Sequence, residues 1–237
     1  MAGQGHTNPF LGARHTVAAV ALCCLILNIF PAAAAWADYL ITGPSGETIG
    51  TSGYWIQGSL LYSDEGREPL NAYEVPSIRA DDLTEEQVEL RNRAMQEFRA
   101  QVLALLDQEE DIFRVHADQL KEMSGDGEPV DEVLDPDRRK ELKREFRSRD
   151  KALEDLKAAW NELRLPDYSL LMMRDIKILQ IVSLEASVEQ ALNYVESGDP
   201  TNLAYAREHL RQAKSFQESF LEALPWSEQQ LGNSPDS

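Results

Sequence analysis

The chain has 237 residues, and its 41 acidic against 23 basic side chains give a formal net charge of −18. Such a surface repels phosphate groups, so we expect no nucleic-acid partner. Both cysteines, Cys23 and Cys24, lie near the start of the chain. The remainder therefore has no thiol for a disulfide, a thiolate zinc site, an iron–sulfur cluster or covalent haem attachment.

Residues 1–37 have the order of a secretory signal peptide. Arg14 precedes an apolar run over 16–30, and Pro31 and alanines lead to Ala35-Trp36-Ala37, a small-x-small cleavage pattern. We expect cleavage after Ala35 or Ala37 and export to the periplasm or outside of a bacterium, with only transient membrane contact through the signal peptide. The apolar stretch is also about as long as a spanning helix, so a retained N-terminal membrane anchor is the alternative.

Residues 38–80 alternate between short strand-like runs and turns. Gly43-Pro44-Ser45-Gly46 and Asp64-Glu65-Gly66 are turn sequences, and the stretch over 54–63 shows a period of two. We expect a small antiparallel β-meander of three or four strands, with its last strand over 70–75.

Helical spacing begins after residue 82. Thr84 and Gln87 form a capping-box pattern that starts a helix over about 85–123. Asp135 and Pro136 start a second helix, whose apolar residues follow a heptad seam. We expect a long helical hairpin over 81–165 that packs as a coiled coil.

Residues 166–224 predict a second, more apolar hairpin that packs with the first. Its first helix, over about 169–196, is apolar on most of its circumference, which is typical of the central helix of a bundle. Gly198-Asp199-Pro200 ends that helix and starts the next. The polar residues 225–237 predict a disordered tail. The fold class is therefore α+β and predominantly helical: a small antiparallel β-meander followed by a four-helix, coiled-coil-like bundle.

One segment of the β region carries a resemblance. Tyr54-Trp55-Ile56-Gln57-Gly58, continued by Leu60-Leu61-Tyr62 and closed by residues 73–78, resembles the short β unit that follows the signal peptide in exported bacterial proteins of unknown function. In those proteins the unit precedes a helical region, as it does here. The resemblance implies no activity and transfers no site.

Aromatic residues of the β region are the first candidate interaction surface. Tyr54, Trp55 and Tyr62 could, if exposed, stack on sugars or bind a partner protein. A sheet this small cannot bury a core alone, however, and its rings would also serve to dock it onto the helices. We favour the docking interpretation.

A basic face on the second helix is the other candidate. Arg138, Arg139, Lys143 and Arg147 lie where the charge of the chain is locally reversed. They could bind an acidic partner or an anionic envelope polymer. In an antiparallel hairpin they would instead pair with the acidic first helix, and we favour that interpretation.

We expect no cofactor, no metal and no catalytic site. His116 and His209 are the histidines that follow the leader, and neither belongs to a Glu-x-x-His pair. Met172 and Met173 are more typical of core packing than of haem ligation. The sequence therefore predicts a non-enzymatic envelope protein, a scaffold or adaptor that contacts an unidentified envelope protein or itself. The alternative is a periplasmic ligand-binding module that holds a sugar, a peptide or a lipid between the sheet and the bundle, or on the aromatic face.

Overall fold

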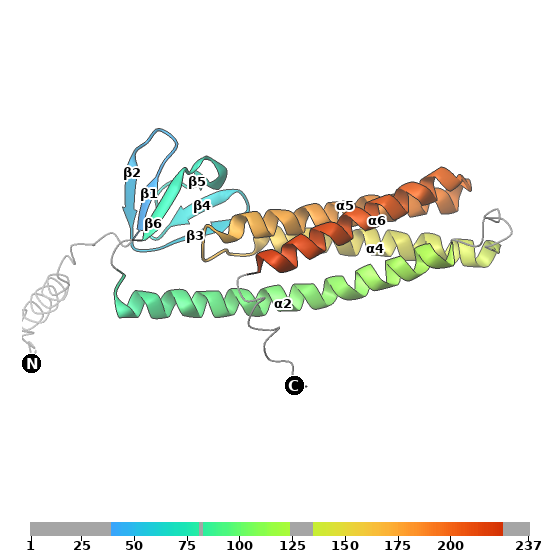
Figure 1. Ribbon diagram of the computed structural model, residues 1–237, viewed down its shortest axis with the longest axis horizontal. Coiled ribbons are helices and arrows are strands. Elements are labelled where there is room, and N and C mark those ends of the chain that lie inside the picture. The colour runs from blue at the N-terminus through green and yellow to red at the C-terminus, as the bar shows by residue number, and fades with distance from the viewer. Residues whose placement is uncertain (1–38, 81–82, 124–134, 225–237) are drawn as a thin grey trace, which may run out of the picture.

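The computed structural model describes residues 39–80, 83–123 and 135–224. The expected signal peptide and C-terminal tail lie outside these ranges. A small antiparallel β region is followed by four long helices (Figure 1), which confirms the α+β, predominantly helical fold class.

The β region contains two three-stranded sheets where we expected a single meander. Its strands are β1 (Tyr39–Thr42), β2 (Thr48–Thr51), β3 (Tyr54–Gln57), β4 (Leu60–Ser63), β5 (Leu70–Asn71) and β6 (Ser77–Ala80). The strand orders are β2-β1-β6 and β3-β4-β5, and all pairs are antiparallel. A 3₁₀ turn, η1 (Ala72–Glu74), follows β5 directly and separates it from β6. The last strand, β6, therefore pairs with β1 in the first sheet, with Ile78 opposite Ile41.

The helices begin at the residues that the sequence indicates. They are α2 (Glu85–Glu122), α4 (Pro136–Glu162), α5 (Leu170–Ser197) and α6 (Pro200–Ala223). Thr84 and Gln87 form the expected capping box of α2, and Asp135 accepts hydrogen bonds from the first backbone amides of α4. Gly198 ends α5 at a φ of +76°, a left-handed conformation that favours glycine.

The bundle is centred on α5, which packs closely against α6 and α4. Helix α2 runs along one side of these three helices and continues beneath the β region (Figure 1). The apolar face of α4, including Leu142, Phe146 and Trp160, is fully buried. Its closest backbone packing is against α5. Over the described ranges the structure is thus a helical bundle, and the expected coiled-coil seam between the first two helices is not shown.

One side of α5 remains exposed, although this helix is apolar almost all round. Met173 lies in the core as expected, but Met172 is 73% exposed, and Leu179 and Val182 are also exposed. None of the helices described here combines the length and the apolar character that a membrane span requires.

A buried ion pair lies inside the bundle. The Lys177 Nζ atom of α5 lies 3.0 Å from both carboxylate oxygens of Glu109 on α2, and it donates to Gln180 Oε1 at 2.6 Å. Burial raises the pKa of Glu109 and lowers the pKa of Lys177, while the attraction between the two charges opposes both shifts. The two opposite charges compensate each other, and the ion pair links α2 to α5 at this position of the bundle.

Candidate functional site: a groove between the β region and α2

The β region is fixed to the helices by backbone pairing. Ile56 of β3 exchanges two hydrogen bonds with Leu165, of 3.1 and 2.8 Å, and the Gly58 amide donates to the carbonyl of Asn161 at 2.9 Å. The segment between α4 and α5 thus covers the edge of β3. An edge strand that is paired in this way is not available to another chain.

A buried arginine provides a second connection. Arg174 of α5 is 2% exposed; it donates to the carbonyl of Gly58 and, at 3.0 Å, to the Tyr73 hydroxyl. The Tyr168 hydroxyl donates to the carbonyl of Val75 at 3.1 Å. The β region and the bundle therefore form one body, and the surface between them has a defined shape.

Between the two parts lies a groove with a volume of about 350 Å³. Its walls come from β1, β3 and the turns that follow β2 and β4, from the N-terminal half of α2 and from the segment that follows α4. The lining residues include Tyr39, Ser52, Gly53, Tyr54, Trp55, Asp64, Gln87, Leu90, Arg91, Ala94, Glu97, Phe98, Gln101, Arg164 and Pro166. This volume lies within the range of small-molecule binding sites, about 300–1,000 Å³.

Two of the three aromatic candidates, Tyr54 and Trp55, line this groove, but Trp55 has both of its faces covered. Its ring is stacked on Tyr62, with 5.4 Å between ring centroids and 9° between planes. The Arg164 Cζ atom lies 3.9 Å from the centroid of the same ring. Tyr62 and Arg164 would collide on one face, so each occupies a different face. Trp55 therefore offers an edge to the groove.

Tyr54 is the third aromatic candidate, and its contacts are also internal. Its hydroxyl accepts a hydrogen bond from the Tyr168 amide at 3.2 Å, and its ring packs edge-on against Tyr39 at 5.0 Å. Burial raises the pKa of Tyr54 to about 12, which keeps the hydroxyl neutral. Tyr54 and Trp55 line the groove, and Tyr62 stacks on the ring of Trp55.

An ion pair fixes one wall of the groove. Arg91 of α2 binds the carboxylate of Asp167, which also accepts a hydrogen bond from the Ser169 amide at 2.9 Å. Burial acts to raise the pKa of Asp167, but the hydrogen bonds from Ser169 and the charge of Arg91 lower it overall. The carboxylate thus stays ionised, and Arg91 is held in place.

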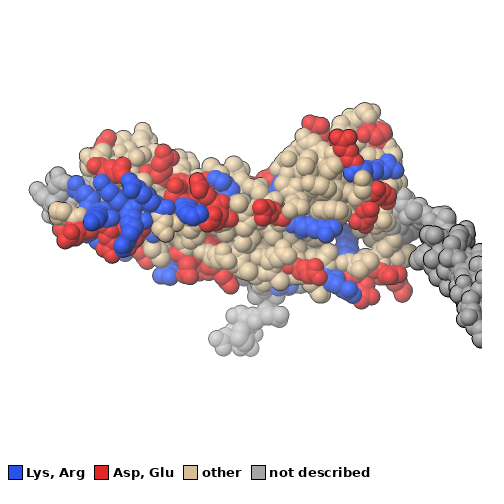
Figure 2. All heavy atoms as spheres, turned by 180° about the vertical axis from the view of Figure 1, so that it is seen from behind, with Lys and Arg blue, Asp and Glu red and all other residues tan. Residues whose placement is uncertain are grey.

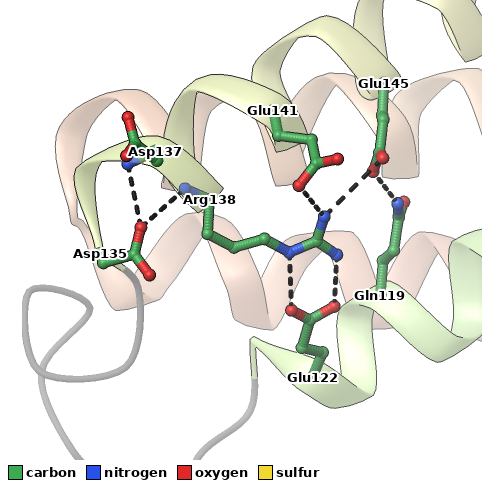
Figure 3. A network of polar contacts seen from close by, with 7 residues as sticks. All are labelled: Gln119, Glu122, Asp135, Asp137, Arg138, Glu141 and Glu145. Atoms are coloured by element: carbon green, nitrogen blue, oxygen red, sulfur yellow. Dashed lines mark hydrogen bonds and ion pairs between the residues drawn. The ribbon is translucent and has the colours of Figure 1, made fainter.

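The basic candidates lie at the other end of the molecule. Figure 2 shows Lys and Arg side chains gathered at the end of the bundle that is remote from the β region. Arg138 donates to both carboxylate oxygens of Glu122 on α2, at 2.8 and 2.7 Å, and to Glu141 at 2.9 Å (Figure 3). This contact lowers the pKa of Glu122. Arg138 thus makes the ion pair that the hairpin interpretation expects.

The remaining basic candidates make different contacts. Arg147 pairs with Glu196 of α5 at 3.1 Å, and Arg139 is half-buried near Tyr194. Lys143 is half-buried, and the structure gives it no ion pair with any described residue. The acidic first helix therefore does not account for the whole basic face.

Comparison of the chain with protein-family models, with curated proteins and with solved structures finds no match. Among the residues that the structure places, no group of three or more His, Cys, Asp or Glu side chains is arranged to hold a metal ion.

Several groove residues carry no signal in the sequence. Leu90, Arg91 and Gln101 lie within a long helix, and Arg164 lies in the segment after α4. A helical pattern shows which face is polar, but it cannot show which stretch of that face lies against the β region.

Proposed function

We propose that the protein is exported and acts without catalysis, by binding an extended polypeptide segment of a partner in the groove between the β region and α2. The groove is the observation that supports this proposal. It combines apolar and polar lining residues, and it lies between two parts of the protein that are fixed to each other by hydrogen bonds. Binding of a partner segment would make the protein the adaptor or scaffold that its sequence suggests.

The composition of the groove favours a peptide. Leu90 and Ala94 provide apolar contact for a side chain, and the Gln101 amide can both donate to and accept from a peptide backbone. Asp64 and Glu97 supply negative charge on the walls. Extended segments are commonly recognised by such a combination of backbone hydrogen bonds and side-chain pockets.

Sugars and lipids fit the groove less well. A sugar would use an open aromatic face, but both faces of Trp55 are occupied, by Tyr62 and Arg164. A lipid chain would place its methylene groups against the charged side chains of Arg91 and Glu97, which is unfavourable for buried apolar groups.

Export is supported by the order of residues 1–37, in which a charged region, an apolar core and a small-x-small sequence follow one another. The absence of cysteine after that stretch is compatible with an oxidising compartment, since the folded part needs no reduced thiol.

Selection from a displayed library of random peptides tests the proposal. We expect selected peptides to bind the purified protein, and Leu90→Glu to weaken binding by about tenfold or more, as for a central contact residue. Leu90 is 53% exposed, so this change leaves the core intact. Leu221→Glu is the matched control, because Leu221 is 45% exposed on α6 and does not line the groove.

Two results would contradict the proposal. One is that Leu90→Glu and Leu221→Glu bind the selected peptides equally well. The other is that no peptide is selected, while an oligosaccharide or a lipid raises the melting temperature of the protein.

A further inference from the structure

A second groove lies between α2 and α4. Its lining comes from residues 111–119 of α2 and 144–152 of α4, and it shares no residue with the groove beside the β region. Its volume of about 580 Å³ lies within the range of small-molecule binding sites, about 300–1,000 Å³. The second groove is therefore large enough to hold a ligand of its own.

Contacts across this groove set the relative level of its two helices. Gln119 of α2 donates to Glu145 of α4, and the Nδ1 atom of His116 lies 3.2 Å from the Nη1 atom of Arg149. Residue numbers thus fall along α2 as they rise along α4, so the two helices are antiparallel here. The polar lining residues lie around these contacts and form one end of the groove.

The other end of the groove has an apolar surface. Val115 lies at about the level of Arg149, and Ile112 and Ala152 lie about one turn further along. Val115 is 38% exposed, so this surface is open to a ligand. An elongated ligand can therefore place a polar group at one end of the groove and an apolar group at the other.

A buried cation lines the polar end without a carboxylate partner. Arg149 is 8% exposed, and His116 is the hydrogen-bond partner that the structure gives it among the described residues. Burial lowers the pKa of Arg149 to about 10, and the charge of Glu145 opposes this shift, so the guanidinium is cationic at neutral pH. A guanidinium has five N–H donors. Most of those of Arg149 are therefore unused, and a buried charge without a counter-ion is unfavourable.

Three neighbouring side chains have unused polar atoms as well. Arg144 and Ser148 lie one turn apart on α4, and the structure gives neither side chain a hydrogen bond or an ion pair with a described residue. Gln119 is 7% exposed, and its Oε1 atom is buried without a hydrogen-bond partner. An anion with a bound water molecule would satisfy these donors and this acceptor together.

The two carboxylates of the lining already have partners. Glu145 lies 3.7 Å from the Nη1 atom of Arg138, and Asp111 pairs with Arg114 at 3.0 Å. The lining arginines have no such partner among the residues that the structure places, so the local charge favours an anion. The net charge of −18 acts from a distance. It is screened at physiological ionic strength, where the Debye length is about 8 Å.

We propose that this groove binds a free aliphatic carboxylate. The head group pairs with the guanidinium of Arg149, which matches a carboxylate in charge and in the geometry of its two oxygens. Arg144 and Ser148 complete its contacts, and the chain lies on Val115 and Ile112. The step from Val115 to Ile112 rises about 4.5 Å along the helix, so a short chain, as in hexanoate, covers the apolar end. This site is independent of the peptide groove, and the failure of either proposal leaves the other standing.

A nuclear magnetic resonance titration of the purified protein with hexanoate tests the site. We expect saturable binding with a dissociation constant of about 1 mM, as for a ligand of so few atoms. Hexanol has the same chain without the charge, and its binding should be weaker by about tenfold or more. Acetate keeps the charge but lacks the chain, and it should also bind more weakly, because the apolar contact is lost.

Three variants test whether hexanoate binds in this groove. Arg149→Met removes the charge but keeps a long side chain, and it should weaken hexanoate binding by about tenfold or more. Val115→Glu places a further negative charge beside the head group and should weaken binding for that reason. Val182→Glu is the matched control, because Val182 is 43% exposed on α5 and does not line the groove.

Each outcome supports or overturns the proposal. It is overturned by a lack of saturable binding, by equal binding of hexanoate and hexanol, or by equal effects of Val115→Glu and Val182→Glu. An acetylated peptide amide with one glutamate that binds this groove more tightly than hexanoate would overturn the assignment to a free acid. Circular dichroism checks that the variants are folded. If Arg149→Met does not fold, the comparison of Val115→Glu with Val182→Glu still decides.

Discussion

The Nε2 atom of His116 lies 2.8 Å from the hydroxyl oxygen of Ser187 in the interior of the bundle. Ser187 donates its only hydroxyl hydrogen to the carbonyl of Ala206 at 2.6 Å, so Nε2 must carry a proton and donate it to Ser187. The Nδ1 atom is then free to accept from Arg149 at 3.2 Å. A single neutral imidazole thereby connects α2, α4, α5 and α6.

This arrangement predicts a specific loss of stability in acid. Burial and then the charge of Arg149 lower the pKa of His116 to about 3. An unfolded histidine binds a proton near pH 6.5. Between these values the unfolded state holds the additional proton, so the free energy of unfolding should fall by up to about 1.4 kcal/mol per unit as the pH falls.

The variant His116→Gln isolates this contribution, because an amide can donate to Ser187 and accept from Arg149 without titrating. Urea unfolding between pH 7 and pH 4 should show a shallower loss of stability for the variant than for the native chain. Equal slopes for the two proteins would show that His116 does not stay neutral in the fold.

The buried pair of Glu109 and Lys177 should be costly to break on one side only. Lys177→Met leaves the Glu109 carboxylate buried without its cation, and we expect a loss of about 3–5 kcal/mol in the free energy of unfolding. Glu109→Leu together with Lys177→Met should recover most of it, because both charges of this pair are then removed. A double variant no more stable than the single one would argue against a charge effect.

The Arg138 network provides a contrast at the surface. Arg138→Met removes the contacts with Glu122 and Glu141, yet the Glu122 side chain is 43% exposed. We expect a loss of about 1 kcal/mol or less, measured by chemical unfolding, since exposed ion pairs are screened by water and salt. A loss as large as that of Lys177→Met would mean that this network governs the packing of α2.

Arg174 should control how firmly the β region is held. Arg174→Met removes the hydrogen bonds to Gly58 and Tyr73, and we expect a loss of about 2–3 kcal/mol. Amide hydrogen exchange of β3 and β4 should accelerate more than that of α6. Tyr73→Phe keeps the bond to Gly58, so its effect should be smaller. Uniform acceleration over the whole chain would instead indicate a general loss of stability.

Local signals in the sequence predicted the helices well. The Thr84 and Gln87 box, the Asp135 cap and the stop at Gly198 are short-range features, and the structure confirms each of them. The pairing of β6 with β1 was not predicted, because a period of two does not specify which strand is the neighbour. The partner of the heptad face of α4 was missed for a similar reason, since a heptad seam does not show which helix it faces.

The candidate site was predicted only in part. Tyr54 and Trp55 stood out as a dense aromatic pair, and both line the groove. The opposite wall includes Leu90 and Gln101 of α2. Its position depends on how α2 packs against the β region, and no local pattern in the sequence of α2 indicates that packing. The two faces of Trp55 are likewise covered by residues that are distant from each other in the sequence, Tyr62 and Arg164.

Site-specific photo-crosslinking in cells that express the protein tests the peptide groove most directly. A crosslinking amino acid replaces Gln101, which lines the groove, or Glu218, an exposed residue of α6, as the control. We expect a crosslinked polypeptide from position 101 that is absent from position 218 and is lost when Leu90→Glu is added. No product from position 101, or the same products from both positions, would contradict it.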